Sequence, residues 1–198
     1  MILPESTGVG SENWTSTYET NVSNEITQGC DDLSNYYNRV AGLRPTWTYH
    51  HIFGRTDARA QIAVEPISNA HPSSSSCSWV DTIYTNLGYA DSGCIEKGRH
   101  HGGDVRTSDG TDWAFDIFVA NSVADSDGLF SDSYFAYAYL GGPFEVQTYD
   151  NDGWGIGQMN KVTRHETSHI FYALDEYSSS GCQCTDSSGY VSYPDQNC

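Results

Sequence analysis

The sequence predicts one mixed α/β domain of the α+β class, in which helices cover a mixed β-sheet. Its 198 residues can bury a core and are few for two domains. Hydrophobic residues make up 37% of the chain and aromatic residues 13%, as is typical of a folded protein. Segments with a helical period also alternate with short segments rich in β-branched and aromatic residues. We expect a single domain over residues 1–198, with its body at about 12–174 and a short, incomplete Cys-rich segment at 175–198.

The first half of the chain predicts one long helix and three shorter elements. Residues 1–13 show no period and predict a loop. Apolar side chains recur at helical spacing over residues 14–41, and a glycine and a proline follow them, so we expect a long helix. Residues 46–54 and 61–67 predict strands. Residues 79–89 predict a short helix.

The second half predicts three strands and a final helix. Residues 91–111 are rich in Gly and Asp and predict no clear element. Residues 112–122 predict a strand, and the alternation of their large apolar side chains predicts one buried face. Residues 133–149 predict two strands around a Gly-Gly-Pro turn. Residues 155–174 return to a helical period, and this helix contains the candidate site.

The charge balance limits the partners that the chain is expected to bind. Nine Lys and Arg against 26 Asp and Glu give a formal net charge of -17, which repels nucleic acid and anionic membranes. Such acidity suits either solvation in a salty or extracellular medium or the binding of Ca²⁺. The candidate calcium ligands are Asp125, Asp127, Asp132, Asp150 and Asp152. Their spacing does not fit an EF-hand loop, so calcium is possible but stays unassigned.

The cysteines predict an oxidising compartment. Six cysteines form an even set without CxxC spacing: Cys30, Cys77, Cys94, Cys182, Cys184 and Cys198. We therefore expect disulfides and a secreted, extracellular protein. Cys77 and Cys94 flank a segment that suits one bridge, whereas Cys182 and Cys184 are too close for easy mutual pairing and one of them is expected to reach Cys198. The first residues lack the pattern of a signal peptide, so we expect that the export signal has been removed or that the sequence is a fragment.

The segment His-Glu-Thr-Ser-His at residues 165–169 is the candidate site. Residues four apart on a helix differ by only about 40° around its axis, so the imidazoles of His165 and His169 point the same way and can hold one Zn²⁺. Two imidazoles and one further ligand leave a position open for water, as in catalytic zinc sites. Glu166 is then the expected general base that takes the proton of this water and later protonates the leaving amine.

Two carboxylates follow the motif as candidates for the third zinc ligand. On a continuous helix, Glu176 would lie about 10 Å along the axis from His169, which is out of reach. Asp175 would lie about 240° around the helix, so it can bind the metal only if the helix stops and the chain turns back. Asp175 is the expected ligand, and a group outside this chain is the alternative. Both carboxylates have a simpler interpretation as helix-end charges or as partners of a histidine.

A tyrosine after the motif and two pairs of adjacent histidines are further candidates for a role in the site. Tyr177 either stabilises an oxyanion or simply packs. The pairs His50-His51 and His100-His101 show no metal spacing, since adjacent residues of a strand point to opposite faces. We expect none of these residues in the catalytic set.

The motif resembles that of the metzincins, HExxHxxGxxH, with Asp in place of the last His as in the snapalysin group. His165, Glu166, His169 and Asp175 match position by position. Two features depart from the pattern: Tyr172 stands where the pattern has its turn glycine, and no methionine follows the motif to form a Met-turn.

The sequence HIFYALDEY is also similar to secreted bacterial metallopeptidases with HExGHIFxxxDEY and, more loosely, to the IgA-specific metalloendopeptidase family; Ser168 replaces the glycine before the second His. The resemblance implies a zincin-like domain with a backing helix, an active-site helix and a lower lobe that this chain contains only in part. It also implies an edge strand, at Tyr137–Tyr139 or Phe144–Gln147, that pairs with extended substrate.

Together these features predict a zinc-dependent endopeptidase that acts on a protein or peptide substrate. One alternative is a secreted binding or adhesion module with structural calcium and an unused HExxH motif. Another is a zinc hydrolase that acts on a non-peptide amide or ester.

Overall fold

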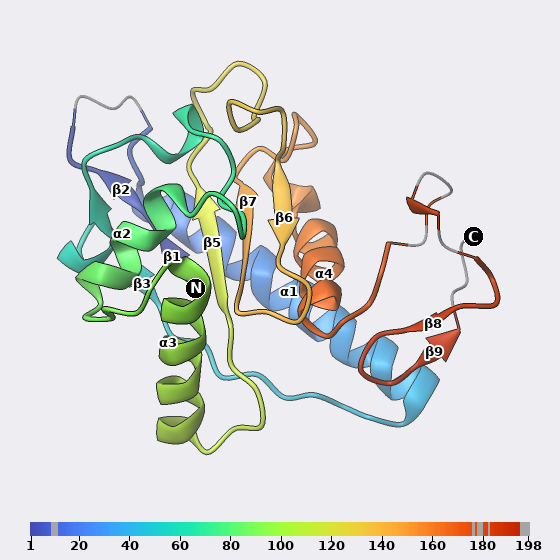
Figure 1. Cartoon of the computed structure of the whole chain (residues 1–198). Coiled ribbons are helices and arrows are strands. Elements are labelled where there is room, and N and C mark those ends of the chain that lie inside the picture. The colour runs from blue at the N-terminus through green and yellow to red at the C-terminus, as the bar shows by residue number, and fades with distance from the viewer. Residues whose placement is uncertain (9–11, 176, 178–179, 182, 195–198) are drawn as a thin grey trace.

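A mixed five-stranded sheet with α-helices on both faces forms the centre of the molecule (Figure 1). The structure, a computed structural model, describes residues 1–8, 12–175, 177, 180–181 and 183–194. The strands of this sheet are β3 (Ile52–Phe53), β1 (Ile2–Leu3), β5 (Asp116–Ala120), β7 (Phe144–Thr148) and β6 (Ala136–Ala138), in this spatial order. All neighbours are parallel except β6 and β7, which are antiparallel. The predicted mixed α/β class is confirmed.

The described residues contain four α-helices: α1 (Ser16–Ala41), α2 (Ser78–Asn86), α3 (Cys94–Asp109) and α4 (Met159–Ile170). The side chain of Thr15 caps α1 by accepting a hydrogen bond from the Tyr18 N–H, and Gly42 ends it in the left-handed conformation at φ 66°. The helices α1, α2 and α4 lie where the sequence predicted them, although α4 ends four residues early. The short 3-10 helices are Ala58–Ala60, Pro66–Ser68 and Ile156–Gln158.

Helix α3 lies in residues 91–111, where the sequence predicted no element. Its glycines hide the helical pattern because they serve close packing. A Cβ atom on Gly98 would lie 2.7 Å from the Tyr84 hydroxyl oxygen and 2.8 Å from Pro143. Only a residue without a side chain permits this approach of α3 to α2 and to the β7 turn.

The predicted loop at residues 1–13 is wrong for its first half, because β1 lies inside the sheet between β3 and β5. Ile2 and Leu3 are completely buried. The next residues form β2 (Glu5–Ser6), which pairs in parallel with β4 (Gln61–Ile62). Strands of two residues are too short to show a period in the sequence, so tertiary pairing decides their conformation.

Helices cover both faces of the sheet, which corrects the prediction of one buried face for residues 112–122. Every residue of β5 and of β7 is buried. One core lies under α2 and α3 and includes Phe118 and Val146, and the other lies under α1 and includes Ile117 and Met159. Parallel strands covered on both sides bury both sets of alternating side chains.

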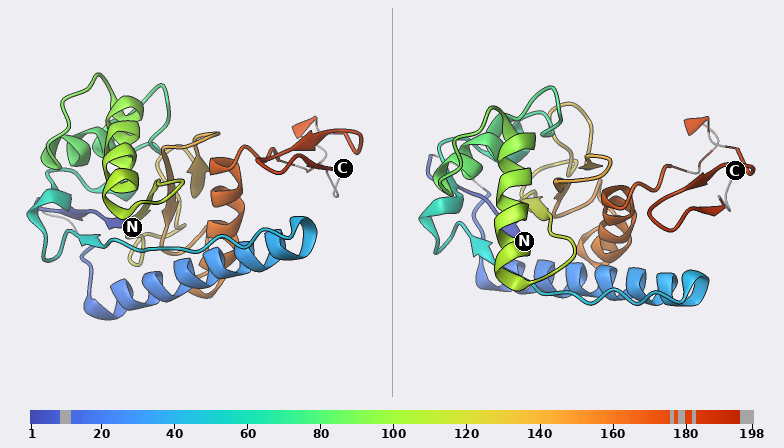
Figure 2. Two further views of the ribbon diagram at one scale, coloured as in Figure 1. Left: turned by 90° about the horizontal axis from the view of Figure 1, so that it is seen from below. Right: turned by 60° about the horizontal axis from the view of Figure 1, so that its bottom comes forward.

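The predicted strands at residues 46–54 and 61–67 are mostly not strands: only β3 and β4 form within them. The rest of the first segment runs beside α1, as both views of Figure 2 show. The Trp47 indole N–H fixes it there by donating to the Cys30 carbonyl oxygen at 3.1 Å and to the Ser34 hydroxyl at 2.7 Å. The aromatic residues that predicted a strand therefore pack against a helix.

The predicted bridge between Cys77 and Cys94 is present and joins the starts of α2 and α3. Cys184 is also disulfide-bonded. Cys30 is a free, buried thiol. Cys182 and Cys198 lie outside the described residues. Disulfides are typical of proteins from oxidising compartments.

No helix in the described part of the chain has the length and apolar character needed to cross a membrane. The chain after α4 includes the antiparallel pair of β8 (Ser187–Ser188) and β9 (Tyr193–Pro194). The residues next to this pair contact the exit of α4, because the Tyr190 N–H donates to the Phe171 carbonyl oxygen at 2.6 Å.

Candidate metal centre

Helix α4 lies against α1 on one side and beside the edge strand β6 on the other (Figures 1 and 2). Its contact with α1 is close, since a Cβ atom on Gly29 would lie 2.6 Å from the Asn160 carbonyl oxygen. This packing places the HExxH segment in the second half of a helix whose position is fixed by two neighbours.

The helix ends in a Schellman motif that turns the chain back. The Ala173 N–H donates to the Ser168 carbonyl oxygen at 3.0 Å, and the Tyr172 N–H donates to the His169 carbonyl oxygen at 2.9 Å. Tyr172 adopts the left-handed conformation, φ 67°. Asp175 can reach the histidines only if the helix stops before it, and α4 ends at Ile170.

Tyr172 takes the left-handed position that a glycine normally occupies. Its ring packs on Gly141, where an added Cβ atom would lie 2.5 Å from the ring. The Gly141 N–H also donates to the His169 carbonyl oxygen at 2.9 Å. The departure from the metzincin glycine therefore does not prevent the turn, because contacts with the loop between β6 and β7 hold it.

The turn brings together the three predicted ligands. The Nε2 atoms of His165 and His169 are 3.2 Å apart, and Asp175 Oδ1 lies 3.1 Å from the first and 3.4 Å from the second. Ligand atoms about 2.0–2.1 Å from a tetrahedral zinc ion are separated by roughly 3.3–3.4 Å. Among the described residues these three side chains form a group that could hold a metal ion.

The surroundings of the three side chains also suit a cation. Asp175 Oδ1 is buried and has no hydrogen-bond partner, which is costly for an anionic oxygen unless a cation binds it. The His169 Nδ1 lies 2.7 Å from the Ala173 carbonyl oxygen, so Nδ1–H donates and Nε2 keeps its lone pair for a metal. Burial, and next the nearby His169, lower the pKa of His165, which favours the neutral form that binds zinc.

Glu166 is buried on the adjacent side of the same helix. Burial, and next the Asp175 carboxylate, raise its pKa to about 8, although a hydrogen bond from the Ala138 N–H opposes both effects. The carboxyl group thus lies between the ligand cluster and the edge strand. A base next to both the metal and the place of an extended substrate is what hydrolysis requires.

The edge strand β6 presents backbone groups that are not used in pairing with β7, beside Glu166. The Tyr139 N–H donates to Phe144 and the Thr148 N–H donates to Phe135, so the odd-numbered residues of this segment face β7. The N–H and C=O groups of Ala136 and Ala138 consequently point away from β7. Of the two segments expected as the edge, only β6 lies at an edge, because Phe144–Gln147 lies inside the sheet.

The sequence did not predict two hydrogen-bond partners of the candidate ligands, the Tyr177 hydroxyl and the Ala173 carbonyl. The Tyr177 hydroxyl donates to Asp175 Oδ2 at 3.2 Å, so this tyrosine orients the carboxylate instead of packing in a core. The Ala173 carbonyl that binds His169 has no signature in the sequence, since only the turn places it. Glu176, which was rejected as a ligand, lies outside the described residues.

The remaining candidate residues have local partners. His50 pairs with Asp109, His100 with Asp91 and His101 with Asp116 at 2.6–2.9 Å, while His51 stacks on Phe53. His100 and His101 lie on α3, which corrects the assumption that they belong to a strand. The described calcium candidates form no group of three ligating carboxylates with one another.

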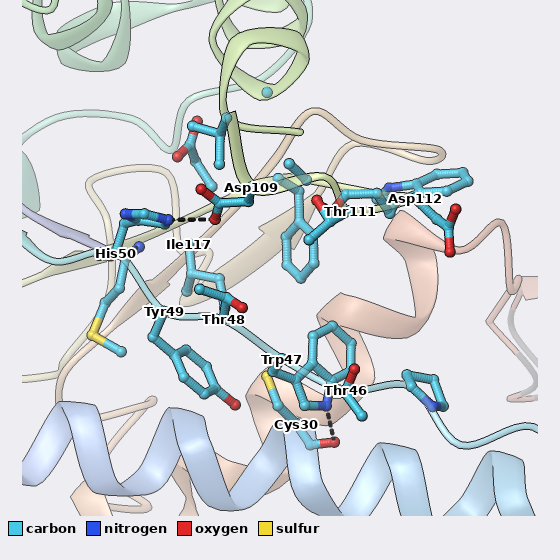
Figure 3. Close-up of a pocket in the computed structure, with 18 of the residues that line it drawn as sticks. Cys30, Thr46, Trp47, Thr48, Tyr49, His50, Asp109, Thr111, Asp112 and Ile117 are labelled. Atoms are coloured by element: carbon cyan, nitrogen blue, oxygen red, sulfur yellow. Dashed lines mark hydrogen bonds and ion pairs between the residues drawn. The ribbon is translucent and has the colours of Figure 1, made fainter. Parts of the chain in front are cut away.

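A cavity of about 800 Å³ lies elsewhere, between α1, the segment after it, and the region joining α3 to β5 (Figure 3). None of the three candidate ligands lines it, nor does Glu166. The His50–Asp109 pair and Trp47 line its wall (Figure 3). The metal cluster is therefore a feature of the sheet edge and not of this cavity.

A comparison of the sequence with models of known protein families found no match. Comparisons with curated proteins and with solved structures found none either.

Proposed function

We propose that the chain is a secreted, zinc-dependent endopeptidase. The observation on which this rests is the convergence of His165 Nε2, His169 Nε2 and Asp175 Oδ1, with mutual distances of 3.1–3.4 Å, beside a buried glutamate and an open strand edge. When bound by these atoms, a zinc ion would polarise the scissile carbonyl and lower the pKa of a coordinated water towards about 7.

Glu166 is the proposed general base and acid. Its carboxylate accepts the proton of the water molecule that attacks the scissile carbonyl carbon, as the C–O bond forms. It then transfers a proton to the amine nitrogen as the C–N bond breaks, so that the carboxylate is regenerated. Its place next to His165 on α4 and beside Ala138 on β6 puts it within reach of both events.

Strand β6 is the proposed binding edge for the substrate backbone. An extended peptide that pairs with the backbone groups of Ala136 and Ala138 that point away from β7 would lie along the cluster, because β6 contacts α4. Recognition through backbone hydrogen bonds favours a polypeptide over a small amide or ester. This favours the endopeptidase over the alternative zinc hydrolase.

The resemblance to metzincins supports the same proposal. The left-handed turn at Tyr172 occupies the position of the family's glycine, and Asp175 follows it as the third ligand. Secretion is proposed from the disulfides, since these form in oxidising compartments.

Cleavage of unfolded casein by the purified protein tests the proposal. We expect the wild type to cleave and to lose activity with 1,10-phenanthroline. We expect Glu166→Gln to keep zinc and lose at least about 10²-fold in kcat, the typical contribution of a general base. Ser34→Ala is the matched control, because Ser34 is a buried polar residue of α1 and is not a member of the ligand cluster.

Two results would contradict the proposal. One is casein cleavage by Glu166→Gln at the wild-type rate. The other is a wild type that resists phenanthroline but unfolds with a calcium-selective chelator, which would favour the binding module built on calcium.

A further inference from the structure

Two polar side chains of β7 enter the buried interface with the active-site helix. Glu145 Oε2 accepts a hydrogen bond from the Thr167 hydroxyl at 3.0 Å, and the Gln147 side-chain N–H donates to the Thr163 hydroxyl oxygen at 2.9 Å. All four residues are completely buried. We call these two contacts the polar seam. Apolar side chains at these positions would stabilise the interface at least as well, so the stability of the fold does not explain the polar ones.

The two contacts of the seam match in spacing. Two residues along a strand span about 6.7 Å, and four residues along a helix rise about 6.0 Å. Glu145 and Gln147 therefore meet Thr167 and Thr163 at nearly the same interval. Two hydrogen bonds with the same spacing on helix and strand prevent α4 from sliding along the sheet and from rotating on it. Apolar packing alone would not do so, because it is not directional.

The same residues of β7 pair with the proposed binding edge. Glu145 is opposite Ala138 and Gln147 is opposite Ala136 in the antiparallel pair. These are the β6 residues whose backbone groups point away from β7. The seam thus connects the helix that bears Glu166 to the strand residues that would hold the substrate, through one intervening strand.

We propose that Glu145 and Gln147 are positioning residues that fix α4, and with it Glu166, at one distance and one rotation relative to the edge strand β6. This inference deepens the proposed peptidase function and rests on it. A misplacement of a reacting group by about 1 Å can cost about 10²-fold in rate, so the seam would act on catalysis more than on folding.

The unpartnered oxygens of the seam agree with a neutral Glu145. Glu145 Oε1 and Gln147 Oε1 are both buried without a hydrogen-bond partner among the described residues. Burial, and next the Glu166 carboxylate, raise the pKa of Glu145 well above its usual range, which favours the neutral carboxyl group.

Paired variants test the proposal, each with a conservative partner. Thr167→Val and Glu145→Leu each remove the hydrogen bond between Thr167 and Glu145. Thr167→Ser keeps the hydroxyl donor, and Glu145→Gln keeps a neutral acceptor. We expect the first two to lose about tenfold or more in kcat, with KM within about threefold and zinc content unchanged. We expect the conservative two to recover most of kcat. Ser34→Ala, which removes a buried hydroxyl elsewhere, serves as the control and keeps kcat.

Hydrogen exchange of the metal-free protein supplies a readout that does not need activity. We expect Thr167→Val to speed amide exchange in α4 by about tenfold relative to α3, and Ser34→Ala not to do so. If α4 exchanges as in the wild type, or if kcat falls only in step with the melting temperature, the positioning proposal is wrong. A wild type without zinc or cleavage would overturn the peptidase function instead, and the exchange data would still decide whether the seam holds the helix.

Discussion

At the scale of single residues, the proposed metal centre depends on which groups hold protons before a metal binds. Glu166 has a pKa of about 8 because it is buried and lies near Asp175, so it is mostly protonated at pH 7. The pKa of His165 is lowered by burial and by His169, so this imidazole is mostly neutral at pH 7. A dication next to Glu166 favours its charged form and lowers its pKa.

Zinc binding at pH 7 is therefore predicted to release protons from Glu166. Calorimetry in buffers of different ionisation enthalpy should find that the wild type releases up to about one proton per zinc. Glu166→Gln should release far fewer, because the amide has no proton to lose and the neutral His165 contributes little. Equal proton release by both proteins would show that the protons come from another group.

Tyr172 gives a second prediction at this scale. A left-handed conformation costs a non-glycine residue about 1–2 kcal/mol, and a β-branched side chain fits it worst. Tyr172→Gly should keep the turn and bind zinc as the wild type does, since relief of the backbone offsets the lost contact with Gly141. Tyr172→Val should weaken zinc binding by displacing Asp175. Competition with a chromogenic chelator measures both affinities, and unchanged affinity in Tyr172→Val would contradict this role of the turn.

At the scale of elements, the edge strand provides the prediction closest to function. Proline at residue 136 removes only an N–H that points away from β7, so β6 should still pair. Ala136→Pro should retain its zinc and raise KM for an unfolded substrate by about fivefold, the value of one hydrogen bond of about 1 kcal/mol. Ala136→Ser keeps the N–H and should match the wild type. Unchanged KM in Ala136→Pro would mean that substrate does not pair with β6 in this way.

The elements also show what the sequence predicts well. Helices α1 and α4 were predicted because an apolar stripe at helical spacing faces a core, and the ligand pair follows from that period. Helix α3 and strand β1 were missed for physical reasons. Glycines that permit close packing replace the apolar stripe of α3, and β1 has only two residues, whose pairing with β3 and β5 is decided by distant parts of the chain.

The candidate site divides in the same way. His165, Glu166 and His169 follow from local geometry, and Asp175 followed from the requirement that the helix stop. Ala138, Ala173 and Glu145 contact Glu166, His169 and Thr167 only because of the strand order and the turn. No local sequence pattern could therefore predict these contacts.

At the scale of the whole molecule, the net charge of -17 predicts a preference among substrates. The field of an acidic protein attracts cationic peptides and raises their rate of association. For two peptides with the same cleavage sequence, the one with flanking lysines should have a higher kcat/KM than the one with flanking glutamates. The difference should shrink as the Debye length falls from about 30 Å at 0.01 M salt to about 3 Å at 1 M. A preference that is insensitive to salt would point to contacts in the site instead of the overall field.

The zinc content of the purified chain, measured by mass spectrometry after dialysis, tests the central claim most directly. We expect about one zinc per chain in the wild type and in Glu166→Gln, and loss of the metal in His165→Ala, His169→Ala and Asp175→Ala. Zinc held by Asp175→Ala as tightly as by the wild type would show that the third ligand is another group. A wild type that binds no zinc after reconstitution would contradict the metal centre itself.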